Sequence, residues 1–329
     1  MIFFNLIIPF LFSIFLIHHI RLLSLNYNIF IDYPKKRGQH FISIPRSGGI
    51  CFFLSFILFF ISNHAFEKNI PFYFLILFIT YPILNFLIGL YDDYKNLNFK
   101  IKLFFQVISS IITTIIIKIF FDFDNINFFT YILLIFFFSI AFININNFMD
   151  GTDAIVITNF MFFLVICILY SFFFGHVEIL SFLIWSLITS LVFLFYNFPP
   201  SKIFLGDSGS YFLGSIVVLI VCYFALFNLK FFLIFLNMYS FFIIDTSLTL
   251  FYRFKNKENI FLPHNKHLYQ QFSSINKKSF SINYIIYMTV NLFFVWLMVY
   301  YNTIVIFTFL NYIFLALIYY IFKKDEITQ

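Results

Sequence analysis

The sequence is poor in charged residues. Asp, Glu, Lys and Arg together supply only 10% of the 329 residues, whereas hydrophobic residues supply 62%. Soluble globular domains carry about 25% charged residues, because charge covers their water-facing surface. This composition excludes an ordinary soluble domain and predicts an integral membrane protein.

Cysteine is scarce as well. Cys51, Cys167 and Cys222 lie within apolar runs without paired spacing, which argues against a disulfide framework or a metal knuckle.

The apolar run Ile2–Leu23 has no basic segment before it and no small-residue cleavage site, so we interpret it as a retained membrane span. Membrane topology accounts for the net charge of +6, and we predict no binding to nucleic acid.

Apolar stretches long enough to cross a bilayer recur along the whole chain. A helix needs about 17 to 25 apolar residues to span the hydrocarbon core. We predict an all-α, polytopic integral membrane protein, with residues 1–329 as a single domain. Its eleven predicted spans lie near residues 2–23, 48–64, 71–90, 101–121, 128–146, 155–174, 178–197, 208–227, 231–251, 281–301 and 303–322.

The basic residues select an orientation for these spans. With the N-terminus outside, the inner segments hold all of the 20 Lys and Arg residues except Lys68, Lys118 and Lys230. Because basic residues are retained on the cytoplasmic side, we expect a periplasmic N-terminus and a cytoplasmic C-terminus in a bacterial inner (plasma) membrane. The inner loops are also the longer and more polar ones, so we expect the functional site on the cytoplasmic face.

Acidic and basic residues collect where the third and fourth spans meet the inner face. Adjacent carboxylates at Asp92 and Asp93 can help to hold Mg²⁺ and the phosphates that it bridges, or can simply lie in a solvated loop. Lys102 and Gln106 lie one helical turn apart. Lys102 is suited to pair with phosphate, and its alternative role is that of an interfacial anchor.

The most informative stretch follows the fifth span. Asn144, Asn147, Asp150 and Asp153 recur every three residues as a strongly apolar helix ends, a spacing that aligns them on one face. Polar groups in one stripe at a membrane surface are costly unless they bind something. We therefore expect a ligand site here.

A third inner loop, Phe204–Ser210, opens the eighth span with small residues around one acid. Gly206 lets backbone amides approach a phosphate, the helix start favours anions, and Asp207 can ligate a metal. The alternative is that Asp207 or Ser208 serves as the N-cap of the following helix.

The longest inner loop, residues 252–280, carries His264 and His267. Their spacing suits phosphate or sugar contacts, and a zinc site would need a third ligand that is not nearby in the sequence. Asp245, inside the ninth span, is either functional or paired with a neighbouring helix. Arg46 adds a fixed cation in the turn before the second span.

Taken in this order, these segments resemble the polyprenyl-phosphate N-acetylhexosamine-1-phosphate transferases, the membrane family that includes phospho-MurNAc-pentapeptide transferase. The resemblance covers about residues 43–270. It rests on Ile44–Gly49, Asp92–Asp93, Lys102–Gln106, Asn144–Asp153, Phe204–Ser210, Asp245 and His264–His267.

The resemblance implies a Mg²⁺-dependent phospho-N-acetylhexosamine transferase, with Mn²⁺ as an alternative metal. Undecaprenyl phosphate would attack a UDP-N-acetylhexosamine, release UMP and start a lipid-linked glycan. The implied partners are these two substrates and membrane lipids, and a homodimer is left open.

The resemblance also assigns roles to residues. Asp92, Asp93 and Asp207 would be catalytic, and Asp207, Asp92 and Asp150 would hold the metal. Phe204 would stack on uracil, His264 and His267 would contact the sugar diphosphate, and Lys102 would offset phosphate charge. The full set of expected substrate-binding residues is Arg46, Lys102, Asn144, Asn147, Asp150, Asp153, Phe204, Gly206, His264 and His267.

The chain departs from the family pattern at Asn96, where a third acid is usual, and at Ala154, where a glycine is usual. Its histidine loop lacks the rich cluster expected of the peptidoglycan enzyme. These features favour the O-antigen-initiating branch, which uses N-acetylfucosamine, N-acetylquinovosamine or N-acetylglucosamine, and they lean toward the deoxy sugars. The main alternative is a transporter or flippase of lipid-linked sugars, whose charges should lie near mid-membrane, as only Asp245 and Lys118 do.

Overall fold

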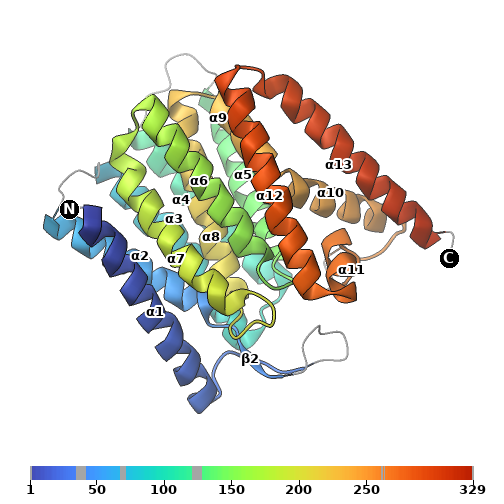
Figure 1. The fold of residues 1–329 in the computed structure, drawn as a ribbon, viewed down its shortest axis with the longest axis horizontal. Helices are drawn as coiled ribbons and strands as arrows, with labels where there is room; N and C mark the ends of the chain where they lie inside the picture. The colour runs from blue at the N-terminus through green and yellow to red at the C-terminus, as the bar shows by residue number, and fades with distance from the viewer. Residues whose placement is uncertain are drawn as a thin grey trace.

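The structure, a computed structural model, describes residues 2–34, 42–66, 72–120, 128–260, 262 and 264–327, and this part of the chain is almost entirely helical (Figure 1). Two short strands, β1 (Ile31–Asp32) and β2 (Ile44–Pro45), pair antiparallel. The helices are α1 (Ile2–Tyr27), α2 (Gly48–Phe66), α3 (Phe72–Lys95), α4 (Phe99–Phe120), α5 (Phe128–Phe148), α6 (Ile155–Phe174), the 3-10 turn η1 (Val177–Ile179), α7 (Leu180–Asn197), α8 (Gly206–Phe227), α9 (Lys230–Met238), α10 (Ser240–Lys255), α11 (Leu268–Ile275), α12 (Lys277–Tyr300) and α13 (Ile304–Ile327).

The predicted spans coincide with helices throughout the described residues. Eight of these helices are long and apolar enough to cross a membrane, and the bent pair α9–α10 makes a ninth candidate. The apolar parts of α2 and α5, Gly48–Ser62 and Ile135–Phe148, are shorter. The all-helical, polytopic class is confirmed, while the count of eleven and the orientation of the termini stay predictions. Lys68 lies outside the described residues.

The ninth predicted span, residues 231–251, is not one continuous helix, because α9 and α10 meet at an angle of 70°. A buried polar network surrounds this break. The Asn237 amide donates to Thr308 Oγ1 at 2.6 Å, its side-chain oxygen accepts from Asn311 at 3.1 Å, and its carbonyl accepts from Asn291 at 3.0 Å. Since lipid offers no hydrogen bonds to backbone groups that a break sets free, side chains must satisfy them.

Helix α8 lies at the centre of the bundle, buried along nearly its whole length, and packs against α2, α3 and α5 (Figure 1). Glycines allow two of these neighbours to come close. A Cβ at Gly89 of α3 would overlap the Asp207 carbonyl, and a Cβ at Gly49 of α2 would overlap the backbone of Gly209. Small residues let helix backbones approach in membranes, and here they bring the end of α3 against the start of α8.

Candidate functional site

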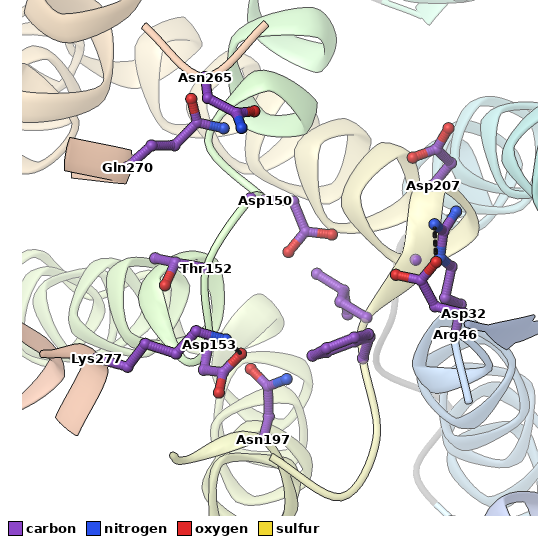
Figure 2. Close-up of a pocket in the computed structure, with 14 residues that line it drawn as sticks. Asp32, Arg46, Asp150, Thr152, Asp153, Asn197, Asp207, Asn265, Gln270 and Lys277 are labelled. Atoms are coloured by element: carbon purple, nitrogen blue, oxygen red, sulfur yellow. Dashed lines mark hydrogen bonds and ion pairs between the residues drawn. The ribbon is translucent and has the colours of Figure 1, made fainter. Parts of the chain in front are cut away.

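A cavity of about 300 Å³ opens at the end of the bundle where α5 ends and α8 begins. Its lining residues are Asp32, Arg46, Asp150, Gly151, Thr152, Asp153, Asn197, Phe204, Leu205, Gly206, Asp207, Asn265, Gln270 and Lys277. Figure 2 shows Asp150 pointing into the middle, with Asp207 and Arg46 on one side and Asn265 and Gln270 on the other. Polar groups that converge on a cavity are typical of a ligand site.

Asp207, in the first turn of α8, joins side chains from two other helices. Its Oδ1 accepts a hydrogen bond from Asn147 Nδ2 of α5 at 3.0 Å, and its Oδ2 lies 3.5 Å from Lys102 Nζ of α4. Asn147 also donates to Ser210 Oγ at 2.9 Å. The structure thus brings together three residues that the sequence places in separate motifs.

Asp92 belongs to the same cluster. Its carboxylate forms an ion pair with Lys102, and its Oδ1 accepts a hydrogen bond from the backbone N–H of Leu97 at 2.7 Å. The Asp92 side chain is only 2% exposed and that of Lys102 is 24% exposed. A freely solvated loop for Asp92 and a purely interfacial anchor for Lys102 are therefore both wrong.

Asp93 has a different partner. Its two carboxylate oxygens accept hydrogen bonds from the backbone N–H groups of Asp207 and Ser208, each at 2.9 Å. The first amides of a helix have no partner within the helix and attract negative charge, so Asp93 caps α8 from another helix. The alternative in which Asp207 or Ser208 caps α8 is wrong, because both already lie inside its first turn.

Gly206 makes this close approach feasible. Its φ of +76° lies in the left-handed region, and a Cβ there would lie 2.6 Å from the Arg46 carbonyl and 2.8 Å from Asp93 Oδ2. Any larger residue would push Arg46 or Asp93 away from the start of α8. Gly206 therefore allows Arg46 and Asp93 to lie against the start of α8.

The predicted polar face from Asn144 to Asp153 is only partly continuous. Helix α5 ends at Phe148, so Asp150 and Asp153 lie in the turn before α6 rather than on the helix. Asn144 donates to Gln106 Oε1 at 2.8 Å and does not line the cavity. The three-residue spacing continues beyond the end of the helix, so the prediction of one continuous helical face is wrong for Asp150 and Asp153.

The turn between α5 and α6 is held by contacts that the motifs do not reveal. Asp153 lies 3.5 Å from Lys277 Nζ, and Asn197 Oδ1 accepts a hydrogen bond from the backbone N–H of Ala154 at 2.9 Å. Asn197 Nδ2 in turn donates to the Ile203 carbonyl at 2.8 Å, which ties the turn to the loop before α8.

Asp150 carries the clearest electrostatic signature in this turn. Burial raises its pKa well above the ordinary value, and the nearby carboxylates of Asp207 and Asp93 raise the pKa further. The positive charge of Arg46 opposes this rise, and a cationic ligand would oppose it in the same way.

The histidine loop is organised by Asp245. This residue of α10 accepts hydrogen bonds from the backbone N–H groups of Leu268 and Tyr269, at 2.9 and 3.0 Å, so it caps α11. Its Oδ1 also lies 3.5 Å from His267 Nδ1. The interpretation of Asp245 as the partner of a neighbouring helix is confirmed. Tyr269 completes the link, since its hydroxyl donates to the Phe148 carbonyl at 2.8 Å.

His264 and His267 themselves lie outside the cavity lining, with their rings stacked at 4.8 Å, whereas Asn265 and Gln270 from the same loop do line it. Within the described ranges, no group of three or more His, Cys, Asp or Glu side chains is arranged to hold a metal ion. The zinc alternative therefore has no support. The same finding means that Asp92, Asp150 and Asp207 do not form a complete three-ligand set on their own.

The donor set nevertheless fits a cation that the ligand helps to hold. Mg²⁺ is usually bound by one or two carboxylates together with substrate phosphates rather than by a protein cage. Asp92 Oδ2 is buried and faces Lys102 rather than a backbone donor, so a cation could take the place of the ammonium group at this oxygen. Asp92 and Asp207 are the residues that would hold such an ion.

The predicted site residues therefore fall into three groups. Arg46, Asp150, Asp153, Phe204, Gly206 and Asp207 line the cavity; Asp92, Asp93, Lys102 and Asn147 contact Asp207; Asn144, His264 and His267 do neither. Sequence reasoning missed Asp32, Thr152, Asn197, Asn265, Gln270 and Lys277 as lining residues. Charge complementarity was the available signal for two of them, since Asp32 pairs with Arg46 at 2.6 Å and Lys277 with Asp153.

The fold and the cavity define a polytopic helical membrane protein with a carboxylate-rich site at one end of its bundle. Residues 74–225 match the model of glycosyl transferase family 4, and this region spans α3 to α8. By this match and by its relatives, the chain is similar to glycosyl transferase family 4.

Three relatives illustrate the similarity. The chain is 27% identical over 256 residues to a probable undecaprenyl-phosphate N-acetylglucosaminyl 1-phosphate transferase of Bacillus subtilis, covering 73% of this chain and 69% of the relative. It is 27% identical over 248 residues to the undecaprenyl-phosphate alpha-N-acetylglucosaminyl 1-phosphate transferase of Thermotoga maritima, covering 74% and 73%. It is 30% identical over 207 residues to the phospho-N-acetylmuramoyl-pentapeptide-transferase of Staphylococcus carnosus, covering 56% of this chain and 62% of that protein's length.

Proposed function

We propose that this protein transfers an N-acetylhexosamine 1-phosphate from a UDP-sugar to undecaprenyl phosphate and releases UMP. The observation that carries the proposal is the meeting of Asp207 with Asp92, Lys102 and Asn147 beside a polar cavity. The names of the relatives in Bacillus subtilis and Thermotoga maritima support the lipid acceptor and the transferred group.

The charges of the site suit a diphosphate with a cation. Arg46 and Lys277 present positive charge to the cavity from opposite sides (Figure 2), where they would pair with phosphate oxygens. Mg²⁺, or Mn²⁺ in its place, would supply charge neutralisation of the diphosphate when bound. Asp207 and Asp92 would hold the ion, and Asn147 would keep the Asp207 carboxylate in place.

The acceptor needs orientation more than deprotonation, because a phosphate monoester is already largely ionised near neutral pH. The carboxylates would therefore act by placing the lipid phosphate in line with the leaving group. Phe204 would offer its ring to uracil, and Asp93 would act through α8, by fixing the position of Asp207.

We place the site on the cytoplasmic face of a bacterial inner membrane. The clustering of basic residues in the inner segments supports this orientation, as does the cytosolic origin of UDP-sugars. For the sugar we propose the O-antigen-initiating branch, with N-acetylfucosamine or N-acetylquinovosamine ahead of N-acetylglucosamine. Asn265 and Gln270 are the neutral groups of the histidine loop that line the cavity and would contact the sugar.

The test is a reconstitution with purified protein, undecaprenyl phosphate, Mg²⁺ and a panel of UDP-N-acetylhexosamines, followed by UMP release. At least one sugar should yield UMP together with a lipid-linked diphosphate sugar. If no sugar in the panel yields UMP, the transferase proposal is rejected.

Asp207→Ala should abolish turnover, with a loss of at least about 1,000-fold, while the protein still inserts and purifies normally. Glu178→Gln is the matched control, because it removes an exposed acid that lies away from the cavity. Glu178 accepts a hydrogen bond from Tyr223, which lies near the C-terminal end of α8. This control should keep near-wild-type activity. Near-wild-type turnover in Asp207→Ala would refute the role of Asp207.

Transport is the competing function, and no observation favours it. Asp245, the intramembrane acid that would support it, is engaged with the start of α11. The polar cavity lies at the end of the bundle, where α5 ends and α8 begins. Substrate-dependent UMP release would separate the two functions directly.

A further inference from the structure

The ammonium group of Lys102 lies between the carboxylates of Asp92 and Asp207. It is ion-paired with Asp92 Oδ2 and lies 3.5 Å from Asp207 Oδ2. The two acids come from different helices, α3 and α8, and Lys102 comes from a third, α4. A single positive charge therefore bridges the two oxygens that a divalent cation would need.

Apart from Lys102, the two carboxylates contact each other and neutral donors. Asp92 Oδ1 accepts from the backbone N–H of Leu97, and Asp207 Oδ1 accepts from the neutral amide of Asn147. Two carboxylates held close together in a poorly solvated place repel each other strongly unless a cation lies between them. Lys102 is the cation that contacts both.

The geometry also leaves this bridge open to replacement. Asp92 Oδ2 is buried and meets the charge of Lys102 rather than a backbone donor. The Lys102 side chain is 24% exposed and ends a flexible four-carbon stem, so its ammonium group can swing away while its backbone stays in α4. A divalent ion carries twice the charge and binds carboxylate oxygens directly.

We propose that Lys102 is a resident counter-ion of the metal site: it bridges Asp92 and Asp207 before a divalent cation binds, is displaced by that cation, and then pairs with the donor diphosphate. The inference rests on the proposed function for the identity of the diphosphate. Its first step, displacement, requires the metal alone. Lys102 thereby holds the two carboxylates in position between turnovers.

The direct test measures the reactivity of the Lys102 amine in the full-length wild-type protein in detergent. A water-soluble acylating reagent labels exposed amines, and mass spectrometry quantifies each lysine. Lys100, an exposed residue at the start of the same helix, is the internal reference. Addition of Mn²⁺ without nucleotide should raise the labelling rate of Lys102 by at least about threefold and leave Lys100 unchanged, because an amine released from an ion pair reacts faster. An unchanged or slower rate at Lys102 would overturn the proposal.

A second measurement compares variants by the binding of Mn²⁺ alone, followed by electron paramagnetic resonance. Lys102→Gln should bind Mn²⁺ at least about tenfold more tightly than wild type, because the metal no longer has to displace an ammonium group. Lys100→Gln removes the same charge from the same helix without a carboxylate contact and should stay within about twofold of wild type. Binding by Lys102→Gln that is equal to or weaker than wild type would overturn the proposal. Tighter binding without the labelling change would do so as well, since it would show repulsion without displacement.

Neither measurement depends on sugar transfer. If UMP release is found but Lys102 labelling does not respond to Mn²⁺, the counter-ion inference fails and the transferase proposal stands. If labelling responds but no UDP-sugar is used, the transferase proposal fails and the counter-ion remains.

Discussion

At the residue scale, side chains of the same type have different roles because their surroundings differ. Asp92 and Asp93 are neighbours in the chain, yet Asp92 faces Lys102 and Asp93 binds the backbone at the start of α8. Consecutive residues near the end of a helix point about 100° apart, so adjacent acids reach different partners. A doubled carboxylate in a sequence therefore does not by itself indicate a shared site.

Ala154 offers a stability test at this scale. Its φ of +67° lies in the left-handed region, which disfavours a Cβ, so Ala154→Gly should stabilise the protein by up to about 1 kcal/mol. Ala141→Gly is the control, because the same substitution inside α5 should destabilise by about 1 kcal/mol. Thermal unfolding in detergent measures both. A lower melting temperature for Ala154→Gly would contradict the backbone argument.

His264 predicts a pH effect. Burial, with the positive charges of His267 and Arg253, lowers the pKa of His264 from 6.5 to about 4. Because the folded protein disfavours the charged form, the fold loses stability as the pH falls from about 6.5 toward 4. His264→Gln should weaken this acid sensitivity, whereas His19→Gln in α1 should not. The test is to measure the melting temperature of each variant across this pH range. If the melting temperatures of wild type and His264→Gln fall equally with pH, the lowered pKa of His264 is contradicted.

At the element scale, two helices begin on carboxylates supplied by other helices. Asp93 of α3 caps α8, and Asp245 of α10 caps α11. Each cap fixes the direction of a helix whose first residues reach the site. The Asn237 network serves a related purpose, because it holds the angle at which α10 leaves α9.

Asp93→Ala should cost about 1–2 kcal/mol of stability and also slow turnover, because the amides of Asp207 and Ser208 lose their partner. Asp93→Asn, which retains one acceptor oxygen, should fall between this variant and wild type. Thermal unfolding and UMP release are measured together, with Glu178→Ala as the control for loss of an exposed acid. A variant as stable as wild type would mean that the cap is dispensable.

Asn237→Leu should destabilise the protein by about 1–2 kcal/mol, since Thr308 and Asn311 each lose a hydrogen-bond partner in the bundle interior, while Asn291 keeps the backbone carbonyl of residue 237. The control is Thr289→Val on α12, whose hydroxyl bonds only to its own helix and faces outward. If both variants have the same melting temperature as wild type, the Asn237 network does not maintain the break between α9 and α10.

At the scale of the whole molecule, the cavity residues come from loops and helix ends that are widely separated in the chain, and all lie at one end of the bundle (Figure 1 and Figure 2). Such one-sidedness is expected when every motif must reach the same ligand. The orientation of the chain in the membrane can therefore be tested with reporters fused at two positions.

A reporter fused after Asn259, in the segment between α10 and α11, should give a cytoplasmic signal, and one fused after Asn228, between α8 and α9, should give a periplasmic signal. Lys and Arg concentrate near the first position, where basic residues are retained inside. A periplasmic signal after Asn259 would overturn the orientation and the cytoplasmic placement of the site.

Hydropathy and charge, summed over windows of about 20 residues, are properties of the chain alone, so the sequence by itself determined the helical membrane class and the approximate span positions. It could not show that α9 and α10 break, because the polar residues that satisfy the break come from α12 and α13. Nor could it show that Asp93 caps α8 or that Lys102 bridges two acids. Those roles depend on which helix ends meet, and only the tertiary packing of α3, α4 and α8 decided that.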